Sequence, residues 1–438
     1  MRQQFVQEDD MQHVITGIKE FYKHMLSNSR VDASEMKEYM ERYFRQAGYR
    51  EEASKPKGKN KSAAKNNIII LHDAGVGDFI LMSAVIREIR RTYSKAHIVL
   101  MINRFAKDMA ECCPCVDEII PCKDEVLTKV SDFFNYFNKI PEIVKPLLKY
   151  RTDVIFNFGH YPSSQLLAYF SGAKERVDLG FMGLDFSFDD LSSYQVDWRD
   201  FKKSHYNERF LYVLHKYSKT SIGNKSLELW LSPLDKFLAA ERVQCIGDKK
   251  LYAIVPGGNI KLASKRWSAE KYAQLMNMVL KEETAAFVIL GGLEDRAAAE
   301  IIQKLVDSKD IIDCVDKMNY RQSAAVLNFC DCYIGNDTGL MHAASALNIP
   351  VLSPNCFPAD INMTVSAFPA LYYPYNVPAV IVQPKHVLPE CKKSNIPIGC
   401  TSDKPHCIEQ ITPETMFEGL KILKKQIATK SKEPIFYN

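Results

Sequence analysis

The feature that most constrains this chain is an alternation of short apolar segments with amphipathic segments, which occurs in two separate blocks. In the first block, apolar runs such as Asn67–His72 and Thr152–Gly159 are separated by segments with helical spacing of their apolar residues. In the second block, the same alternation runs from Leu251–Gly258 to Ile349–Pro354. Strands that alternate with helices pair in parallel and form α/β sheets. We therefore predict an α/β fold with two doubly wound units.

The two blocks divide the chain into four parts. Residues 1–66 are predicted to be a helical extension that ends in a polar, lysine-rich linker over Ser54–Asn67. We expect one α/β domain over residues 67–240 and a second over residues 241–410. The last part, residues 411–438, is expected to form an amphipathic helix, opened by a Thr-Pro pair, that packs back toward the first domain.

Composition narrows the classes of partner. The 438 residues carry a formal net charge of +4, which is too small to predict nucleic-acid binding. The first residues show no apolar signal region, and no apolar run approaches the roughly 18–20 residues that span a membrane. We therefore expect a cytoplasmic protein whose membrane contact is at most peripheral. The twelve cysteines are then expected to be reduced thiols.

The first glycine-rich turn, His72–Asp78, joins a strand to a helix. Gly75 and Gly77 allow a tight turn and the close approach of a ligand at the carboxyl edge of the sheet. The third glycine of a dinucleotide fingerprint is absent, since Ile80 holds its place. The Asp78 carboxylate is stabilised as the anion at a helix N-terminus, which suits a general base. A helix-capping role fits the same position equally well.

Cationic residues follow the strand that ends at Pro256–Gly258. Lys265 and Arg266 stand in a short loop before a helix that Ser268 is expected to cap. Cations in this place can stabilise a diphosphate through charge-assisted hydrogen bonds of about 1.5–3 kcal/mol each. The alternative is a solvated surface loop. Trp267 disfavours that alternative, because a tryptophan beside two cations usually packs and holds them in place.

Two further turns complete the set. Glu294 follows a strand that ends in two glycines, where an acid can accept the hydroxyl groups of a ribose, although an acid at a helix start is also commonplace. In the segment Gly335–Gly339, backbone N–H groups and the Thr338 hydroxyl can form an anion site at a helix N-terminus. His342 lies on the first turn of that helix, where a packed structural histidine is the commoner case.

Two motifs are absent from the sequence, and the cysteines carry no clear metal pattern. There is no Asp-x-Asp pair for a nucleotide-bound metal and no G-x-x-x-x-G-K-[ST] phosphate loop. We therefore expect Lys, Arg and helix N-termini to stabilise a leaving diphosphate, with no required cofactor or metal. Cys391, Cys400 and Cys407 lack the paired C-x-x-C spacing of a zinc site, which favours loop packing over a metal site there.

These four turns, in this order, resemble those of glycosyltransferase family 9, the ADP-heptose–lipopolysaccharide heptosyltransferases. The resemblance covers about Asn67–Ala428 and is most specific in the segments GVGDFILMSAVIREIR, SKRWSAEKYAQL and NDTGLMHAASAL. It implies a GT-B fold, in which two Rossmann-like domains face a cleft, with the acceptor on the first and the donor on the second. This chain departs from the family pattern by the addition of residues 1–66 and by Ser268 in place of a proline.

The resemblance also implies roles for individual residues. Asp78 matches the catalytic base of the family. Lys265 matches the lysine that binds the donor diphosphate, and Glu294 looks like the acid that binds the ribose. The remaining matches are the turn that holds the diphosphate and the donor sugar (Asp337, Thr338, Gly339 and Leu340) and three accessory residues (Gly77, Arg266 and His342).

The function implied by the resemblance is an inverting, metal-independent transfer of heptose from ADP-heptose to a hydroxyl of a lipopolysaccharide core acceptor, at the cytoplasmic face of the inner membrane. One alternative is a glycosyltransferase that uses another nucleotide-sugar or a protein acceptor. A second is a non-catalytic scaffold that binds a nucleotide-sugar, which the joint presence of Asp78, Lys265 and Asp337 disfavours. An NAD-dependent enzyme is disfavoured by the missing third glycine.

Overall fold

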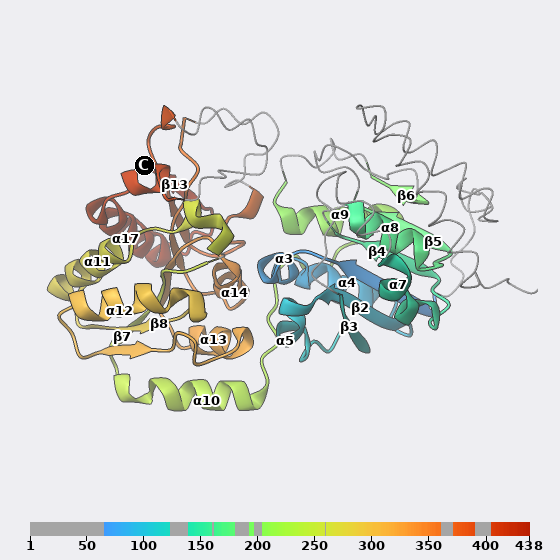
Figure 1. The fold of residues 1–438 in the computed structure, drawn as a ribbon, viewed down its shortest axis with the longest axis horizontal. Coiled ribbons are helices and arrows are strands. Elements are labelled where there is room, and N and C mark those ends of the chain that lie inside the picture. Colours follow the sequence, from blue (N-terminus) through green and yellow to red (C-terminus); the bar gives the residue numbers. More distant parts are fainter. Residues whose placement is uncertain are drawn as a thin grey trace, which may run out of the picture.

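The computed structural model describes residues 65–122, 139–159, 162–179, 192–196, 204–258, 260–360, 371–389 and 404–438. In this part of the chain, two parallel β-sheets lie side by side with helices packed around them (Figure 1). The predicted α/β fold with two doubly wound units is confirmed. Of the predicted N-terminal extension and linker, residues 1–64 lie outside the described residues.

The first sheet has six strands in the order β3-β2-β1-β4-β5-β6, and every neighbouring pair is parallel. Its strands are β1 (Asn67–His72), β2 (His97–Asn103), β3 (Glu118–Cys122), β4 (Val154–Asn157), β5 (Glu175–Asp178) and β6 (Tyr194–Gln195). The helices of this first half are α3 (Val76–Leu81), α4 (Ser83–Thr92), α5 (Lys107–Ala110), α7 (Ile140–Leu148), α8 (Pro162–Phe170) and α9 (Tyr206–Ser218). The strand order reverses between β1 and β4, and ligands of such sheets bind at this reversal.

The second sheet has seven parallel strands in the order β13-β12-β11-β10-β7-β8-β9. Its strands are β7 (Lys250–Val255), β8 (Ala285–Ile289), β9 (Ile311–Asp313), β10 (Cys332–Gly335), β11 (Val351–Pro354), β12 (Ala379–Val382) and β13 (Ile435–Tyr437). The helices of this second half are α11 (Ala269–Glu282), α12 (Arg296–Leu305), α13 (Tyr320–Leu327), α14 (Gly339–Ala346) and α17 (Pro413–Ala428), and α10 (Pro233–Val243) connects the halves. Here the order reverses between β7 and β10.

Apolar side chains on both faces of the sheets form the core. In β1 the run Ile68–Leu71 is completely buried, as expected for a parallel strand that helices cover on both sides. In α4, Val85, Ile86 and Ile89 are buried at the spacing of one helical face. The strands therefore hold the turns at their carboxyl ends on a rigid support.

The C-terminal segment corrects one prediction. We expected it to pack toward the first half, but α17 lies against β11, β12 and α11, and β13 then pairs with β12. The reason is that the apolar face of α17, which includes Leu420 and Leu423, finds its partner surface on the second sheet. Gly419 permits the close approach, since a Cβ there would lie 3.1 Å from side-chain atoms of both Leu352 and Val382. The predicted helix start is confirmed, because Thr412 caps the helix that begins at Pro413.

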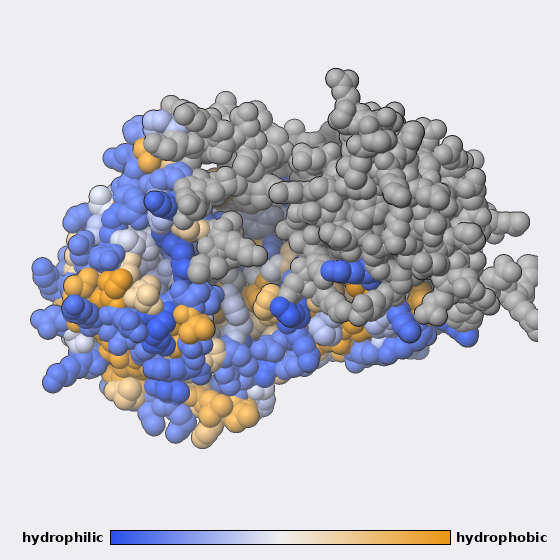
Figure 2. Space-filling view, viewed as in Figure 1, coloured by the Kyte–Doolittle hydropathy of each residue, from blue (hydrophilic) through white to orange (hydrophobic). Residues whose placement is uncertain are grey.

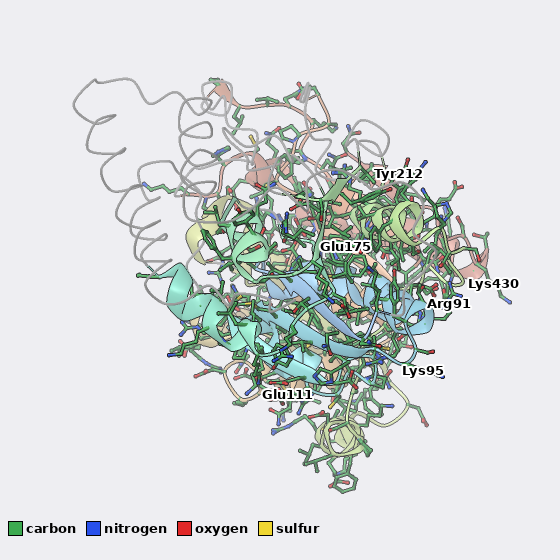
Figure 3. The ribbon with its side chains drawn as sticks, turned by 90° about the vertical axis from the view of Figure 1, so that its right-hand side faces the viewer. Arg91, Lys95, Glu111, Glu175, Tyr212 and Lys430 are labelled. Carbon is green, nitrogen blue, oxygen red and sulfur yellow. The ribbon has the colours of Figure 1, made fainter. Side chains whose placement is uncertain are left out.

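The two halves meet directly where α3 contacts α14. Polar and aromatic side chains make further contacts between the halves on either side of these two helices. On one side, Arg321 of α13 donates to Asp235 of α10 (2.7 Å) and, in the first half, to the Asp108 carbonyl (2.8 Å) and the Glu111 carboxylate (3.0 Å). Glu111 lies at the lower edge of the molecule in Figure 3, the side on which α10 runs in Figure 1. These bonds fix α13 relative to the first half.

On the other side, the start of α9 packs against the segment before β12. The His205 imidazole hydrogen-bonds to the Tyr373 carbonyl (3.0 Å), and the Tyr206 ring stacks on the Tyr372 ring with 4.9 Å between centroids. The Tyr375 hydroxyl donates to Glu208 (3.2 Å). The halves thus meet through ordered side chains as well as through the connecting helix.

The visible surface of the second half is mostly hydrophilic, with hydrophobic patches toward the lower edge where α10 lies (Figure 2). On α10, Leu234 and Phe237 are 63% and 61% exposed. Among the described residues, no helix has the length and apolar character needed to cross a bilayer.

Candidate active site

The first turn places Asp78 at the start of α3. β1 ends at His72, and α3 begins at Val76 after an extended Gly75. The Asp78 carboxylate accepts a hydrogen bond from the Gly75 N–H (3.2 Å), so it caps the helix, and its side chain remains partly exposed. Capping and a role in chemistry are therefore compatible, because the capping bond also orients the carboxylate.

Glycines allow α3 and α14 to meet end to end. A Cβ on Gly77 would lie 2.9 Å from Cδ2 of His342 and 3.3 Å from the Gly339 Cα. A Cβ on Gly339 would lie 3.2 Å from the Gly77 nitrogen. Side chains at either position would push the helices apart, so the two glycines bring Asp78 to the second half. The Asp78 charge accordingly adds to the raised pKa of Lys265 and opposes the lowering of the His342 pKa by burial.

Lys265 and Asp337 form an ion pair beside this contact. The Lys265 ammonium lies 2.8 Å from Oδ2 of Asp337, and both side chains are largely buried. Burial opposes the charged form of each group, but the pair outweighs burial, so the pKa of Lys265 is raised and that of Asp337 is lowered. Asp337 thus holds a charged lysine in place at the end of β10.

Asn336, which has no exposed surface, connects the two neighbouring turns of the second half. Its amide donates to the carbonyls of Pro256 (2.6 Å) and Gly257 (3.1 Å), and its oxygen accepts from the Trp267 N–H (3.2 Å) and the Tyr272 hydroxyl (2.8 Å). One buried side chain therefore sets the distance between the turn after β7 and the turn after β10. Substitution by an apolar residue would leave several buried backbone groups unpaired.

Trp267 is buried, as its position beside two cations led us to expect. Its indole N–H donates to the Ile411 carbonyl (2.9 Å), and its ring packs edge-on against Tyr272. The next residue, Ser268, caps α11 through a bond from the Lys271 N–H (3.4 Å). The loop that carries Lys265 is thus anchored at its end.

His342 lies in the first turn of α14 with its ring against Gly77. Burial lowers its pKa, and Lys265 acts in the same direction, against the charges of Asp337 and Asp78. The imidazole is therefore neutral near pH 7. Its Nδ1 atom is buried and has no hydrogen-bond partner among the described residues. The structure brings His342 together with Asp78, Lys265 and Asp337.

The turn after β8 has Glu294 at the surface and Asp295 buried beneath it. Asp295 forms an ion pair with Arg266. The Arg266 guanidinium is therefore held in place near Glu294. A Cβ on Gly257 would overlap the Asp295 carboxylate at 2.0 Å, which explains the glycine after β7. Arg266 thus supports the turn, whereas Lys265 faces the α3–α14 contact.

Thr338 and Gly339 begin α14, with Leu340 buried behind them. The Tyr333 hydroxyl donates to the Asn336 carbonyl (2.7 Å) and lies 3.4 Å from the Thr338 hydroxyl. These contacts fix the turn with its first N–H groups at the contact between α14 and α3. Free N–H groups at a helix N-terminus are suited to bind an anion.

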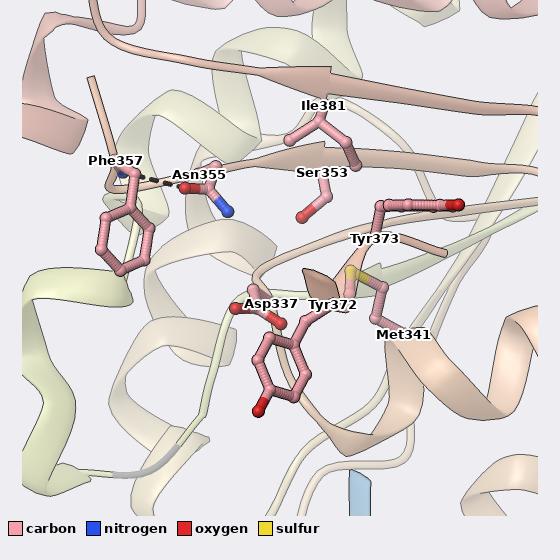
Figure 4. A pocket seen from close by; sticks show the side chains of 8 residues that line it. All are labelled: Asp337, Met341, Ser353, Asn355, Phe357, Tyr372, Tyr373 and Ile381. Carbon is pink, nitrogen blue, oxygen red and sulfur yellow. Dashed lines mark hydrogen bonds between the residues drawn. The ribbon is translucent and has the colours of Figure 1, made fainter. Parts of the chain in front are cut away.

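A small pocket opens beside Asp337 (Figure 4). Its cavity volume is only ≈ 10 Å³, and Asn355 in its wall accepts a bond from the Phe357 N–H (2.8 Å). It is lined by Asp337, Met341, Ser353, Asn355, Phe357, Tyr372, Tyr373 and Ile381. A carboxylate, an amide and hydroxyl groups thus surround a small space next to the turn after β10.

Sequence reasoning missed three residues of this region. Asn336 and Asp295 act through buried contacts that no local motif reveals, although Asn336 lies within the segment Gly335–Gly339 that was predicted to bind an anion. Tyr320, whose ring lies against Gly339, is the first residue of α13, a helix start to which sequence reasoning assigned no function. Of the cysteines considered for a metal, Cys391 and Cys400 lie outside the described residues. Within the described residues, no three His, Cys, Asp or Glu side chains gather as a metal site would require.

Comparison with known proteins agrees with this geometry. Residues 142–353 match the family Glycosyltransferase family 9 (heptosyltransferase), a span that contains Lys265, Glu294 and Asp337 but not Asp78. The chain is 22% identical to lipopolysaccharide heptosyltransferase 2 of Escherichia coli over 298 residues, which cover 65% of this chain and 81% of that protein. It is 28% identical to lipooligosaccharide heptosyltransferase 2 of Haemophilus influenzae over 111 residues, which cover 25% of this chain and 32% of that protein.

Among solved structures, a glycosyl transferase family 9 protein from Veillonella parvula superposes with a TM-score of 0.66 and 19% identity, covering 84% of this chain and 100% of that one. This likeness shows the GT-B fold. The matched residues, the curated relatives and the fold agree: residues 142–353 are similar to glycosyltransferase family 9, the chain has the GT-B fold, and it is a glycosyltransferase.

Proposed function

We propose that this glycosyltransferase moves a heptose from ADP-heptose to a hydroxyl of a lipopolysaccharide core acceptor at the cytoplasmic face of the inner membrane, with inversion and without a metal. The names of the relatives support the heptose and the lipopolysaccharide acceptor. One observation carries the proposal. Gly77, which precedes Asp78 in α3, lies against Gly339 and His342 of α14, so the Asp78 carboxylate of the first half belongs to the same region as the Lys265–Asp337 pair of the second half.

On the acceptor side, Asp78 is the general base. Its carboxylate takes the proton of the acceptor hydroxyl while that oxygen forms a bond to the anomeric carbon. The bond from the anomeric carbon to the diphosphate oxygen breaks on the opposite face, so the configuration inverts. A positioned base of this kind contributes about 10²–10⁴-fold to the rate. The capping bond from Gly75 supports the role, because it holds the carboxylate in one orientation.

On the donor side, the charge of the leaving diphosphate is stabilised by Lys265 and by the N–H groups and hydroxyl at the start of α14. Asp337 keeps the lysine charged and positioned, so these groups need no rearrangement as charge develops, which is the condition for large electrostatic stabilisation. Because His342 is neutral, it adds no second positive charge beside Lys265. Glu294 is placed to accept the ribose hydroxyls, beside the Arg266–Asp295 pair.

The test is transfer itself. Purified protein is incubated with ADP-heptose and a lipopolysaccharide core truncated before its heptose, and the product is followed by mass spectrometry. We expect a mass gain of one heptose, an inverted anomeric configuration by NMR, and an unchanged rate in the presence of EDTA. Binding of ADP, UDP and GDP is compared by calorimetry in parallel. Tighter binding of UDP or GDP than of ADP, with no heptose transfer, would refute the proposed donor.

A further inference from the structure

Tyr320 lies at the edge of the proposed donor site and has no part in the function described so far. It is the first residue of α13, and its Cε1 and hydroxyl are the atoms that a Cβ on Gly339 would meet at 3.2 Å. Its ring therefore lies over the start of α14. The residue is nevertheless 37% exposed, whereas the neighbouring Tyr333 is fully buried.

The surroundings of Tyr320 place it between two parts of the nucleotide site. Burial and the charge of Glu294 raise the pKa of Tyr320 to about 12. Glu294, which we expect to bind the ribose, is therefore near Tyr320, and Gly339, in the turn proposed to bind the diphosphate, lies against its ring. At neutral pH the hydroxyl is protonated, so it can donate a hydrogen bond to an anion.

The backbone at Tyr320 is held without help from its ring. Asn319 and Gln322 cap α13 reciprocally, with bonds of 2.9 Å from the Gln322 N–H and 3.0 Å from the Asn319 N–H. Arg321, the next residue, is fixed by Asp235 and Glu111. The helix start therefore does not depend on the aromatic side chain, and the exposed ring is available for a ligand.

We propose that Tyr320 contacts the nucleoside diphosphate of the donor, with its hydroxyl donating to a phosphate oxygen at the start of α14 and its ring packing against the ribose held by Glu294. Its role is binding, because Asp78 already supplies the general base of the proposed reaction. This inference rests on the proposed function, since it requires a nucleoside diphosphate in this site.

The experiment measures the affinity of the full chain for ADP and for adenosine by calorimetry, in wild type and in the variants Tyr320→Ala, Tyr320→Phe and Phe329→Leu. Stacking of an aromatic ring on a nucleic-acid base changes affinity by about 5- to 100-fold, and we take this as the range for a ring packed against the ribose. We expect Tyr320→Ala to weaken both ligands within this range. Tyr320→Phe should weaken ADP about 5- to 10-fold and leave adenosine unchanged, because it removes only the hydroxyl that donates to the phosphate.

The control, Phe329→Leu, changes a ring that follows the other end of α13 and is similarly exposed at 38%, and it should leave both affinities unchanged. Equal ADP affinity in Tyr320→Ala and wild type would overturn the inference while leaving the proposed function intact. Equal weakening in Phe329→Leu would also overturn it, since the effect would then belong to the helix. A wild-type protein that binds none of ADP, UDP and GDP would overturn both the inference and the proposed function.

Discussion

The turns after β1 and β10 have the same local structure, but their carboxylates have different partners. Each leads from a buried parallel strand to a helix N-terminus, and each carries a carboxylate near the helix start. In the second half, Asp337 is largely buried and paired with Lys265 at 2.8 Å. In the first half, Asp78 has a similar, intermediate exposure but accepts a bond from a backbone N–H at 3.2 Å.

The difference indicates two tasks for one kind of side chain. A carboxylate paired with an ammonium has its charge engaged and serves to position that cation. A carboxylate bonded only to a neutral N–H keeps the capacity to accept a proton from a substrate. The contact of Gly77 with Gly339 and His342 brings the two turns together. The following predictions test whether each turn performs the task assigned to it.

The largest loss of activity is expected for the variant Asp78→Asn. The amide keeps the size of the side chain and can still accept from the Gly75 N–H, but it cannot take a proton. We expect kcat to fall about 10²–10⁴-fold with ADP affinity unchanged within about twofold. Steady-state kinetics and calorimetry measure both quantities. A variant with near wild-type kcat would show that the first turn has no catalytic role.

Lys265→Met should weaken binding of the donor, whereas Asp78→Asn should lower kcat. Loss of a charge-assisted hydrogen bond to the diphosphate is expected to weaken ADP binding by about 1.5–3 kcal/mol, roughly 10- to 150-fold. The variant also leaves Asp337 largely buried without its cation, so its melting temperature should fall. The double variant with Asp337→Asn should recover stability but not affinity, since the unpaired charge is removed. Recovery of ADP binding would contradict the assignment of Lys265.

Gly77→Ala tests whether the two turns must touch. The added Cβ would approach His342 at 2.9 Å and the Gly339 backbone at 3.3 Å, so α3 and α14 must separate. A displacement of this size costs up to about 10²-fold in rate, and we expect kcat to fall about 10- to 100-fold. The control is Gly75→Ala, whose Cβ would meet only Asp78 at 3.5 Å, an ordinary contact. Equal rates for the two variants would mean that the helix contact is not required.

The smallest expected effect is on the pH dependence of stability, and it concerns His205 at the contact between the halves. Burial lowers the pKa of His205 to about 3, against the bond to the Tyr373 carbonyl. The unfolded value is about 6.5, so the unfolded chain binds more protons between these pH values, and the free energy of unfolding falls as the pH is lowered through this window. The slope from this residue is about 1.4 kcal/mol per pH unit.

His205→Asn removes this titration and keeps a side chain that can cap α9. Urea unfolding at pH 7 and pH 5 should therefore show a smaller acid destabilisation for the variant than for the wild type. An identical slope would show that His205 is not buried in the neutral form, and that the halves are less closely joined there than the structure indicates.

Much of the fold and part of the site were predictable from local signals. The alternation of strands and helices identified both doubly wound units, because periodicity and turn residues act over short distances along the chain. The same logic located Asp78, Lys265, Glu294 and the turn Asp337–Leu340 at strand ends. Their roles remain predictions until the variants are measured. Asn336 and Asp295 were not predictable, since their importance lies in partners far away in the sequence.

What the sequence determined by itself was therefore the set of strand-end turns, since each depends on neighbouring residues alone. Only the tertiary structure decided that Gly77 of α3 lies against Gly339 and His342 of α14, that Arg266 pairs with Asp295, and that α17 packs on the second sheet. Those outcomes depend on which apolar surfaces bury one another and how closely two backbones approach. Such packing is a property of the whole folded chain, and no local segment encodes it.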